Sequence, residues 1–335
     1  MILILSENSD SSTEQVMDWI ERLGHRCIRV NGEDVDGGGP FTLWMDETGG
    51  WFDSLTNTPK NEVKAVWYRR WGHARRYHGV SLLNDRGAGM QPYKVSLSAS
   101  FHLARELSTL SEGVFSAYEA AYWLGDPSND TPNKLLVIRE AVRAGLDVPV
   151  TLVSSDREAV HAFAAEYGRI IMKPLGDVAM FQFGRDFYLT YTTECTPELL
   201  DRGPPRFFPT LFQERLEKEY ELRVFYLAGD LYAMAIFSQG DAQTEGDFRR
   251  YNRRKPNRNV PYALPGEVAE RLRALMRALK LNTGSLDLVR TTDGRYVFLE
   301  VNPIGQFGMV SDPCNYHLER RIAQHLIDVS SGRDV

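Results

Sequence analysis

The chain has 335 residues, of which 43% are hydrophobic and 25% charged, a globular composition with room for two or three domains. Its 39 Lys and Arg residues against 45 Asp and Glu give a net charge of −6, which argues against a general binder of nucleic acid. The three cysteines form no C-x-x-C pair, which argues against a structural zinc site. The sequence has no signal peptide and no apolar stretch near ~20 residues, so we predict a cytoplasmic protein that does not bind a membrane.

The first third of the chain alternates between the patterns of strands and helices. An apolar run at residues 2–5 is followed by helical spacing at 9–23, behind a Ser/Asp/Thr cap, and by a second apolar run at 27–30. This strand–helix–strand order predicts a parallel sheet with helices on its faces. Three further elements are predicted in this region: a hairpin over 41–51, a strand over 63–69 and a long helix over about 93–123.

A cluster of turn residues at 125–132 separates this region from the rest of the chain. Beyond it, Gly229-Asp230 and Asp293-Gly294 lie between alternating apolar strands, which predicts antiparallel hairpins. The strands predicted after the boundary are 148–153, 169–173, 181–183, 187–192, 211–215, 222–227, 231–237, 285–289 and 296–301. The predicted helices are 134–144, 156–167, 197–202, 265–279 and 316–329.

Acidic and amide side chains on the last two predicted strands form the strongest candidate site. Asp287 can pair with Glu300 across this hairpin, and Glu300 and Asn302 share one face of their strand. Three hard oxygen donors suit Mg²⁺, which completes its coordination with water and nucleotide phosphates. The alternative is that these are ordinary solvent-facing residues. However, both carboxylates lie between Leu, Val and Phe, where an unpaired charge costs several kcal/mol.

Two isolated lysines form a second candidate group. Lys134 opens a predicted helix, and Lys173 ends an apolar strand just before Pro174. A lysine at the end of a buried strand can project its ammonium into a cleft as a point charge for phosphate. Either lysine alone is more commonly a surface residue whose stem packs on apolar groups. The phosphate hypothesis therefore depends on the acidic group described above.

Residues 211–216, Leu-Phe-Gln-Glu-Arg-Leu, form a short apolar strand with a polar end. Its backbone and Glu214 can face an adenine ring, although an ordinary edge strand has the same pattern. Glu221 and Arg223 lie two positions apart on the next strand, so both can face one cleft. No P-loop, G-x-G-x-x-G, H-E-x-x-H or G-x-S-x-G signature is present, which argues against P-loop, dinucleotide, zincin and α/β-hydrolase sites.

Taken in order, these motifs resemble the ATP-grasp superfamily over roughly residues 1–330. The shared pattern is Asn-Lys before a helix, then Met-Lys-Pro, Gln-Glu-Arg-Leu, Glu-Leu-Arg-Val, Ser-Leu-Asp and Leu-Glu-Val-Asn-Pro. Trp67-Tyr-Arg-Arg-Trp71 and Asp247-Phe-Arg249 resemble the peptide-maturing branch, the graspetide synthetases, which include the microviridin-type and grasp-with-spasm maturases. The first of these two motifs can equally consist of core and ion-pair residues.

The resemblance implies an α/β (α+β) architecture, the ATP-grasp fold. It implies an N-terminal pre-ATP-grasp parallel-sheet domain at residues 1–125, a central α+β domain at 126–213 and a C-terminal antiparallel-sheet domain at 214–335. One feature departs from the pattern. Many ATP-grasp enzymes carry a Gly/Ser-rich flap after the second lysine, whereas residues 173–180 contain Gly176 alone.

The resemblance also implies a role for each matching residue. Lys134 and Lys173 would contact the nucleotide phosphates, and Arg223 would stabilise charge on the γ-phosphoryl group in transfer. Asp247 and Arg249 would lie where the acceptor carboxylate meets the nucleophile, with Asp247 either accepting a proton or orienting a neighbour. The other implied contacts are Gln213, Glu214, Arg215 and Leu216 to adenine, Glu221 to the ribose, and Asp287, Glu300 and Asn302 to two Mg²⁺ ions.

Enzymes of this branch use ATP to phosphorylate Asp or Glu side chains of a ribosomal precursor peptide and join them to a Ser or Thr hydroxyl or a Lys amine. The resemblance implies the same reaction here, with a precursor peptide as partner and a homodimer as the assembly. We expect the leader segment of the peptide to dock on the hairpin 181–192 and the helix 197–202, unless this hairpin merely extends a sheet. The basic loop 249–258 is either a solvated charge run or a clamp for an acidic core peptide.

Two other functions share the same nucleotide site. A carboxylate–amine ligase that adds an amino acid to a protein terminus or a small acid would differ in its acceptor pocket alone. A non-catalytic ATP-binding module would need only the nucleotide pocket, but the complete acidic trio and both lysines argue against it.

Overall fold

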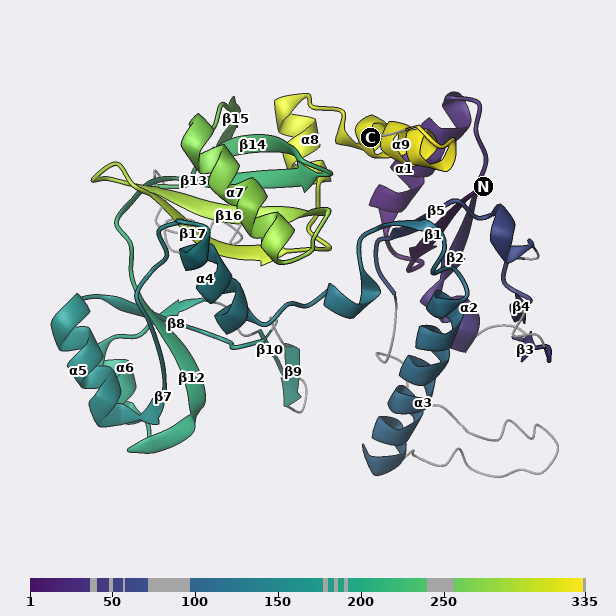
Figure 1. The fold of residues 1–335 in the computed structure, drawn as a ribbon. Coiled ribbons are helices and arrows are strands. Elements are labelled where there is room, and N and C mark those ends of the chain that lie inside the picture. The colour runs from purple at the N-terminus through teal and green to yellow at the C-terminus, as the bar shows by residue number, and fades with distance from the viewer. Residues whose placement is uncertain are drawn as a thin grey trace. The chain divides into compact units, whose positions relative to one another are not determined.

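The computed structural model describes residues 1–36, 41–47, 51–56, 58–71, 97–176, 180–183, 186–189, 192–239 and 256–333. These residues form two compact units, and Figure 1 shows the ribbon of each. Unit 1 consists of Met1–Pro127 and His317–Val335, and unit 2 of Ser128–Tyr316. The last helix of the chain therefore belongs to unit 1, and the three-part division at residues 125 and 213 stays a prediction.

Unit 1 contains a four-stranded sheet in the order β2-β1-β5-β6. Its strands are β1 (Ile2–Ser6), β2 (Cys27–Asn31), β5 (Ala65–Tyr68) and β6 (Tyr122–Leu124). Every neighbouring pair is parallel, and all five residues of β1 are buried, as expected for a central strand covered on both faces. The predicted parallel sheet is therefore confirmed.

The long helix predicted over residues 93–123 is wrong at its end, and residues 93–96 of it lie outside the described residues. Helix α3 (Leu97–Ser116) is followed by a turn, after which β6 pairs with β5. Tyr122 and Trp123 are residue types that favour strands, and the indole of Trp123 donates to the backbone oxygen of Tyr118 at 3.0 Å. Pairing along the sheet edge thus outweighs the helical spacing of these residues.

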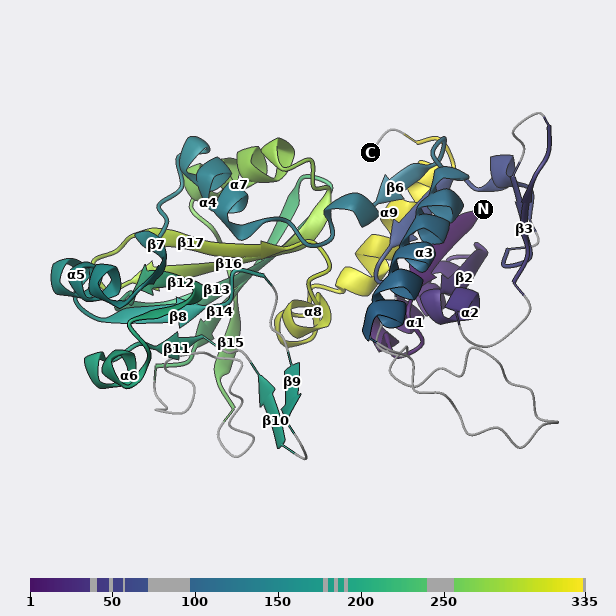
Figure 2. The ribbon, with the colours of Figure 1, turned by 90° about the horizontal axis from the view of Figure 1, so that it is seen from below.

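Helices pack on this sheet in the way that its strand–helix–strand order predicts. Helix α1 (Ser11–Arg22) begins behind its expected polar cap, where Asp10 accepts a hydrogen bond from the backbone nitrogen of Ser12 at 3.0 Å. Helix α9 (Leu318–Ser330) contacts α1 and β5, and both views show it beside α1 (Figures 1 and 2). The remaining elements of unit 1 are α2 (Gly32–Asp36), the 3₁₀ turn Lys60–Glu62 and the antiparallel pair β3 (Leu43–Met45) and β4 (Trp51–Asp53).

A buried ion pair joins the start of α1 to the end of β5. Arg69 Nε lies 3.1 Å from Asp10 Oδ2, and the side chains of both residues are at most 6% exposed. Arg70 adds a second cation, since its Nε lies 3.6 Å from the same oxygen while its Nη1 lies 3.1 Å from Glu7 Oε1. Trp67 is buried in the core of unit 1, so the Trp67–Trp71 motif supplies both core and ion-pair residues there.

This ion pair predicts a pH-dependent stability difference for Asp10→Asn. Burial disfavours the Asp10 carboxylate, but Arg69, the Ser12 hydroxyl and Arg70 outweigh it and hold the pKa of Asp10 below its ordinary value of 3.8. Because breaking a buried pair costs about 3–5 kcal/mol, we expect the variant to lose about 3 kcal/mol of unfolding free energy near neutral pH. A carboxyl whose pKa is lowered on folding stabilises the fold above its unfolded pKa, so the difference should shrink as the pH falls below 3.8.

Chemical denaturation of both proteins across this pH range measures that difference. Asp18→Asn is the matched control, because Asp18 lies on the exposed side of the same helix. A constant difference between wild type and Asp10→Asn down to the lowest pH would contradict the ion-pair explanation.

Unit 2 contains two antiparallel sheets, and the first of them has four strands in the order β11-β8-β12-β7. These strands are β7 (Thr151–Asp156), β8 (Ile170–Lys173), β11 (Thr193–Glu194) and β12 (Arg206–Glu214). Helices α5 (Arg157–Tyr167) and α6 (Pro197–Arg202) lie together beside these strands (Figure 2). Their apolar side chains, with Phe163 and Leu200 among them, pack against Ile170 and Phe212 of the sheet.

Two strands of this sheet differ from their predicted bounds. The strand predicted at 148–153 occupies 151–156, and the one predicted at 211–215 already begins at Arg206. In both cases the pairing of Arg206 with Asp156 extends the sheet into a segment that has no apolar alternation: β7 continues through polar residues, and β12 begins with Arg-Phe-Phe-Pro-Thr. Ladder hydrogen bonds, which composition does not reveal, set these ends.

The second sheet has five strands in the order β15-β14-β13-β16-β17, all antiparallel. Its strands are β13 (Lys218–Leu227), β14 (Asp230–Phe237), β15 (Arg258–Tyr262), β16 (Thr283–Thr291) and β17 (Tyr296–Asn302). Helices α4 (Lys134–Arg143) and α7 (Gly266–Ala278) cover one face, where Leu272 and Leu275 meet Leu288 and Phe298 in a fully buried core. Both predicted hairpins of this sheet are confirmed, whereas β15 was not predicted.

Three elements of unit 2 complete the description. Strands β9 (Met180–Phe183) and β10 (Asp186–Leu189) pair as the predicted antiparallel hairpin, and helix α8 (Gly308–Cys314) contacts β13, β14 and β15. None of the helices in the described parts of the chain is both long enough and apolar enough to cross a membrane.

Candidate active site

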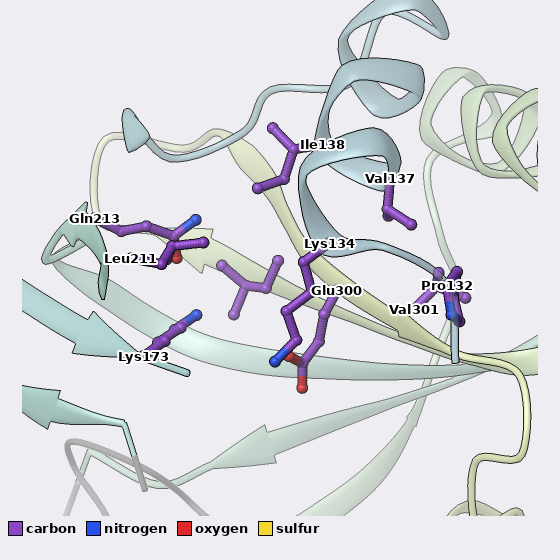
Figure 3. A pocket seen from close by; sticks show the side chains of 10 residues that line it. Pro132, Lys134, Val137, Ile138, Lys173, Leu211, Gln213, Glu300 and Val301 are labelled. Atoms are coloured by element: carbon purple, nitrogen blue, oxygen red, sulfur yellow. The ribbon is translucent and has the colours of Figure 1, made fainter. Parts of the chain in front are cut away.

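A pocket in unit 2 lies where α4, the four-stranded sheet and the edge strand β17 meet (Figure 3). Its charged and polar lining consists of four side chains that the sequence analysis singles out, Lys134, Lys173, Gln213 and Glu300. The rest of the lining is apolar and was not predicted, since buried apolar residues carry no chemical signature: Pro132, Val137, Ile138, Leu211, Leu299 and Val301.

Helix α4 supplies Lys134 at its first position. Asn133 caps the helix, accepting hydrogen bonds from the backbone nitrogens of Leu135 and Leu136 at 3.0 and 3.3 Å. Lys134 Nζ donates to the backbone oxygens of Pro174 and Gly176 at 3.3 and 2.5 Å. Lys134 is thereby hydrogen-bonded to the segment that directly follows Lys173.

The four-stranded sheet presents alternate residues of β12 to the pocket. Gln213 lies opposite Thr151 on β7 and Ile171 on β8, and Leu211 lies opposite Lys173. Because cross-strand partners share a face, Gln213 and Lys173 are diagonal neighbours on the pocket face. The intervening residue Phe212 points the other way and packs under α5 and α6, which fixes the register.

The five-stranded sheet carries a charged row across three neighbouring strands. Arg223 on β13 pairs with Asp287 on β16, which pairs in turn with Glu300 on β17. Arg223 Nη1 donates to both oxygens of Asp287, at 2.7 and 2.6 Å, and both residues are less than 10% exposed. The predicted meeting of Asp287 and Glu300 across the hairpin is therefore found in the structure.

A β-bulge makes this pairing possible. Glu300 lies opposite Asp287 and Phe298 lies opposite Leu288, so the register skips Leu299. Asn302, two residues beyond Glu300, lies opposite Ser285 and is exposed. All three predicted oxygen donors thus belong to the same face of the sheet, opposite the hydrocarbon core beneath α4 and α7.

Two glycines allow the turn after Asn302 to pass close to β16. A Cβ on Gly284, whose φ is +154°, would lie 3.1 Å from the backbone oxygen of Asn302. A Cβ on Gly305 would collide with the side chain of Ser285 and lie 3.0 Å from the same oxygen. Glycine at both positions therefore fixes where Asn302 emerges from the sheet.

Glu221 lies on the same face of β13 as Arg223 but is 6% exposed and already partnered. Lys218 Nζ donates to its Oε1 at 2.5 Å, and Ser238 Oγ donates to the same oxygen at 3.0 Å. Burial raises the pKa of Glu221 above its ordinary value, although Lys218 and Ser238 act in the opposite direction.

The strand end after Gln213 is held by backbone and ion-pair contacts. Glu214 Oε1 accepts from the backbone nitrogen of Val150 at 2.9 Å, and Arg215 Nη1 lies 3.8 Å from Glu194 Oε2. Leu216 is half-buried. These three predicted residues follow the pocket wall along the chain but do not line the pocket itself, and Asp247 and Arg249 lie outside the described residues.

The donor set at the end of the charged row fits a magnesium ion. It contains two carboxylates that face each other and one amide oxygen, the small set of hard donors that Mg²⁺ takes when water and phosphate supply the remaining ligands. Within the described ranges, no group of three or more His, Cys, Asp and Glu side chains gathers into an all-protein metal cage. The three oxygen donors would suit a metal that arrives with a phosphate ligand.

No protein-family model matches the chain, and no curated protein sequence matches it either. Solved structures do. The macrocyclase MdnC from Microcystis aeruginosa MRC, bound with its precursor peptide MdnA, superposes with a TM-score of 0.80 at 27% identity, over 98% of this chain and 99% of that one. A RiPP-associated ATP-grasp ligase from Chryseobacterium gregarium, in complex with ADP and a leader and core peptide, gives 0.81 at 20% identity, over 100% and 97%.

A third solved structure is less similar to this chain. D-alanyl-alanine synthetase A from Vibrio cholerae superposes with a TM-score of 0.56 at 13% identity, over 99% of this chain and 97% of that one. The sheets of unit 2 and the likeness over nearly the whole chain show the fold of the ATP-grasp ligases. The solved structures that share this fold include the macrocyclases MdnC and MdnB, at 27% and 26% identity.

Proposed function

We propose that the chain is an ADP-forming ligase that phosphorylates Asp or Glu side chains of a ribosomal precursor peptide and joins them to Ser or Thr hydroxyls or Lys amines. The observation that carries this proposal is the convergence of Lys134, Lys173 and Glu300 on one pocket, with Asp287 and Arg223 in the adjoining row. The likeness to MdnC over nearly the whole length of both chains supports a peptide as the acceptor.

The chemistry follows from the inertness of a carboxylate. Expelling an oxide or hydroxide ion from it is prohibitive, whereas transfer of the γ-phosphoryl group of ATP gives an acyl phosphate with a good leaving group. A hydroxyl or amine then attacks the acyl carbon, phosphate leaves, and the nucleophile's proton passes to a base. Catalysis of these steps is mainly positioning and stabilisation of negative charge.

Each residue of the site has a part in this scheme. Lys134 and Lys173 neutralise the nucleotide phosphates, and Arg223 stabilises the γ-phosphoryl group during transfer. Asp247 and Arg249 act where the carboxylate meets the nucleophile. The residues proposed to hold the nucleotide base and ribose are Gln213, Glu214, Arg215, Leu216 and Glu221, and those proposed to hold two Mg²⁺ ions are Asp287, Glu300 and Asn302. When bound, Mg²⁺ supplies charge neutralisation between the phosphates.

The partner and the assembly are also part of the proposal. The leader segment of the precursor docks on the β9–β10 hairpin and α6, the protein is a homodimer, and it acts in the cytoplasm. Both MdnC and the Chryseobacterium ligase were solved with peptides, which supports a peptide partner of this kind.

Mass spectrometry tests the reaction directly. The protein is incubated with ATP, Mg²⁺ and the short peptide encoded beside its gene, and we expect the peptide to lose the mass of one water molecule for each link formed. Gain of an amino-acid mass would instead assign the carboxylate–amine ligase. Unchanged peptide with no ADP release would overturn the proposed function.

Lys134→Met is expected to weaken ADP binding roughly tenfold, because one point charge near phosphate is worth ~1–2 kcal/mol in a partly exposed pocket. Loss of its bonds to Pro174 and Gly176 also releases the segment after Lys173. Calorimetry with ADP and Mg²⁺ measures the change. Lys64→Met, at an exposed position of unit 1, is the control, and equal affinity in the two variants would remove Lys134 from the nucleotide site.

A further inference from the structure

Ser285 carries a buried hydroxyl group that makes no hydrogen bond. The residue lies on β16, two positions before Asp287, and is 1% exposed. Among the residues that the structure describes, none is a hydrogen-bond partner of Ser285 Oγ, which is also shielded from water. A buried polar atom without a partner is unfavourable, and native proteins rarely keep one without a reason. The groups around the hydroxyl indicate what that reason is.

The surroundings of this hydroxyl leave one polar side chain directly opposite it. On β13 the cross-strand neighbour of Ser285 is Phe225, whose ring packs at 5.7 Å from that of Phe307 and offers no hydrogen-bonding group. The turn after β17 lies over the hydroxyl, with Gly305 against the Ser285 side chain. On β17 the cross-strand neighbour is Asn302, which begins this turn by accepting from the backbone nitrogen of Gly305 at 3.0 Å.

Asp287 is less suited to serve as the partner. It lies two residues further along β16, about 6.6 Å away by the rise of a strand. Both of its carboxylate oxygens also accept from Arg223 Nη1, at 2.7 and 2.6 Å. The side chain across the ladder, Asn302, is therefore the better candidate.

The proposed metal role of Asn302 gives its amide nitrogen a need for an acceptor. A side-chain amide that gives its oxygen to a cation keeps two N–H donors. Cross-strand partners have Cβ atoms about 4.5–5.5 Å apart, so a change of rotamer brings the Asn302 amide within reach of the Ser285 hydroxyl. Groups that hydrogen-bond to a metal ligand fix its orientation and tune metal affinity.

We propose that Ser285 is a positioning residue for the metal site, with Oγ accepting a hydrogen bond from Asn302 Nδ2 and thereby directing Asn302 Oδ1 toward a divalent cation that binds with the nucleotide. This inference rests on the proposed function, since it assigns a further residue of the same site. The buried hydroxyl gains its partner when the Asn302 amide turns toward it.

Ser285→Ala removes the hydroxyl group alone. Because no described residue bonds to that group, we expect a melting temperature without nucleotide equal to or above that of the wild type. In calorimetric titrations with ADP at a series of Mg²⁺ concentrations, we expect the Mg²⁺ concentration needed for half-maximal ADP binding to rise roughly tenfold.

Ser111→Ala is the matched control, because Ser111 is a buried serine of α3 whose hydroxyl is fully engaged. It accepts from Trp71 Nε1 at 3.0 Å and donates to the backbone oxygen of Leu107 at 2.7 Å. Ser111→Ala should therefore lower the melting temperature and leave the Mg²⁺ requirement unchanged. The two serine variants are thus expected to differ in both measurements.

A double-mutant cycle shows whether Ser285 acts through Asn302. Asn302→Ala should itself raise the Mg²⁺ requirement, and adding Ser285→Ala should change it by less than about twofold, because the amide that the hydroxyl orients is gone. A further tenfold rise in the double variant would overturn the positioning role.

Two other results would overturn the inference and leave the ligase proposal intact. One is a wild-type Mg²⁺ requirement in Ser285→Ala, and the other is a melting temperature of Ser285→Ala that falls as in Ser111→Ala. A wild-type protein that binds no ADP at any Mg²⁺ concentration would overturn both the inference and the proposed function.

Discussion

Glu300→Gln should reduce peptide dehydration by more than about 100-fold while leaving peptide binding unchanged. The substitution removes one negative charge from the pair that faces the proposed metal position and changes little else in shape. Metal ions contribute several kcal/mol of charge stabilisation in phosphoryl transfer, and each 1.36 kcal/mol is tenfold in rate. The rate of water loss from the peptide, followed by mass spectrometry, measures the effect.

The control for this variant is Glu270→Gln. Glu270 is an exposed carboxylate on α7 that pairs with Arg273, and its loss should not alter the rate. Raising the Mg²⁺ concentration should partly restore the Glu300 variant if the defect lies in metal binding. Full activity of Glu300→Gln at low Mg²⁺ would remove Glu300 from the metal site.

Gly305→Ala is expected to lower both stability and activity. The new methyl group would overlap the Ser285 side chain and press on the backbone oxygen of Asn302. Overpacking at a buried position costs roughly 1–3 kcal/mol, and the shift moves Asn302 away from the face that carries Glu300. Chemical denaturation measures the stability, and the dependence of the reaction rate on Mg²⁺ measures the displacement of Asn302.

Gly308 provides the comparison for this prediction. It lies three residues further on, at the first position of α8, and no atom outside its neighbours lies within 4 Å of a Cβ built there. Gly308→Ala should therefore be neutral or slightly stabilising, because alanine lowers the entropy of the unfolded chain. Equal loss of stability in both variants would show that the tight approach at Gly305 is not the cause.

Local patterns in the sequence predict most of the fold. The parallel opening, the hairpins across Gly229-Asp230 and Asp293-Gly294 and nearly all of the helices follow from apolar spacing and turn residues. The short helices α2 and α8 were not predicted, and the errors in the strands share one cause. Strands β6 and β15, and the shifted ends of β7 and β12, depend on pairing with a distant strand. No local pattern contains that information.

The contacts of the candidate site also differ in whether the local sequence predicts them. The pairing of Asp287 with Glu300 could be predicted because a two-residue turn joins their strands. The bidentate contact of Arg223 with Asp287 could not, since β13 and β16 are separated by two strands and a helix in the sequence. The anchoring of Gln213 by Thr151 likewise depends on the register between β12 and β7. The three-part domain division and the roles of Asp247 and Arg249 stay predictions.

The single skipped residue in β17 has a consequence for how this strand tolerates change. In an uninterrupted ladder, Glu300 would have the same parity as Phe298 and its carboxylate would turn into the hydrocarbon beneath α4 and α7. Leu299 reverses that parity, so one strand contributes an aromatic ring to one side and an anion to the other. The strand should therefore tolerate a change of side chain at Leu299 better than a change in its number of residues. Deleting one residue here would turn Glu300 toward the hydrocarbon core, whereas replacing Leu299 by another apolar residue would leave Glu300 on its present face.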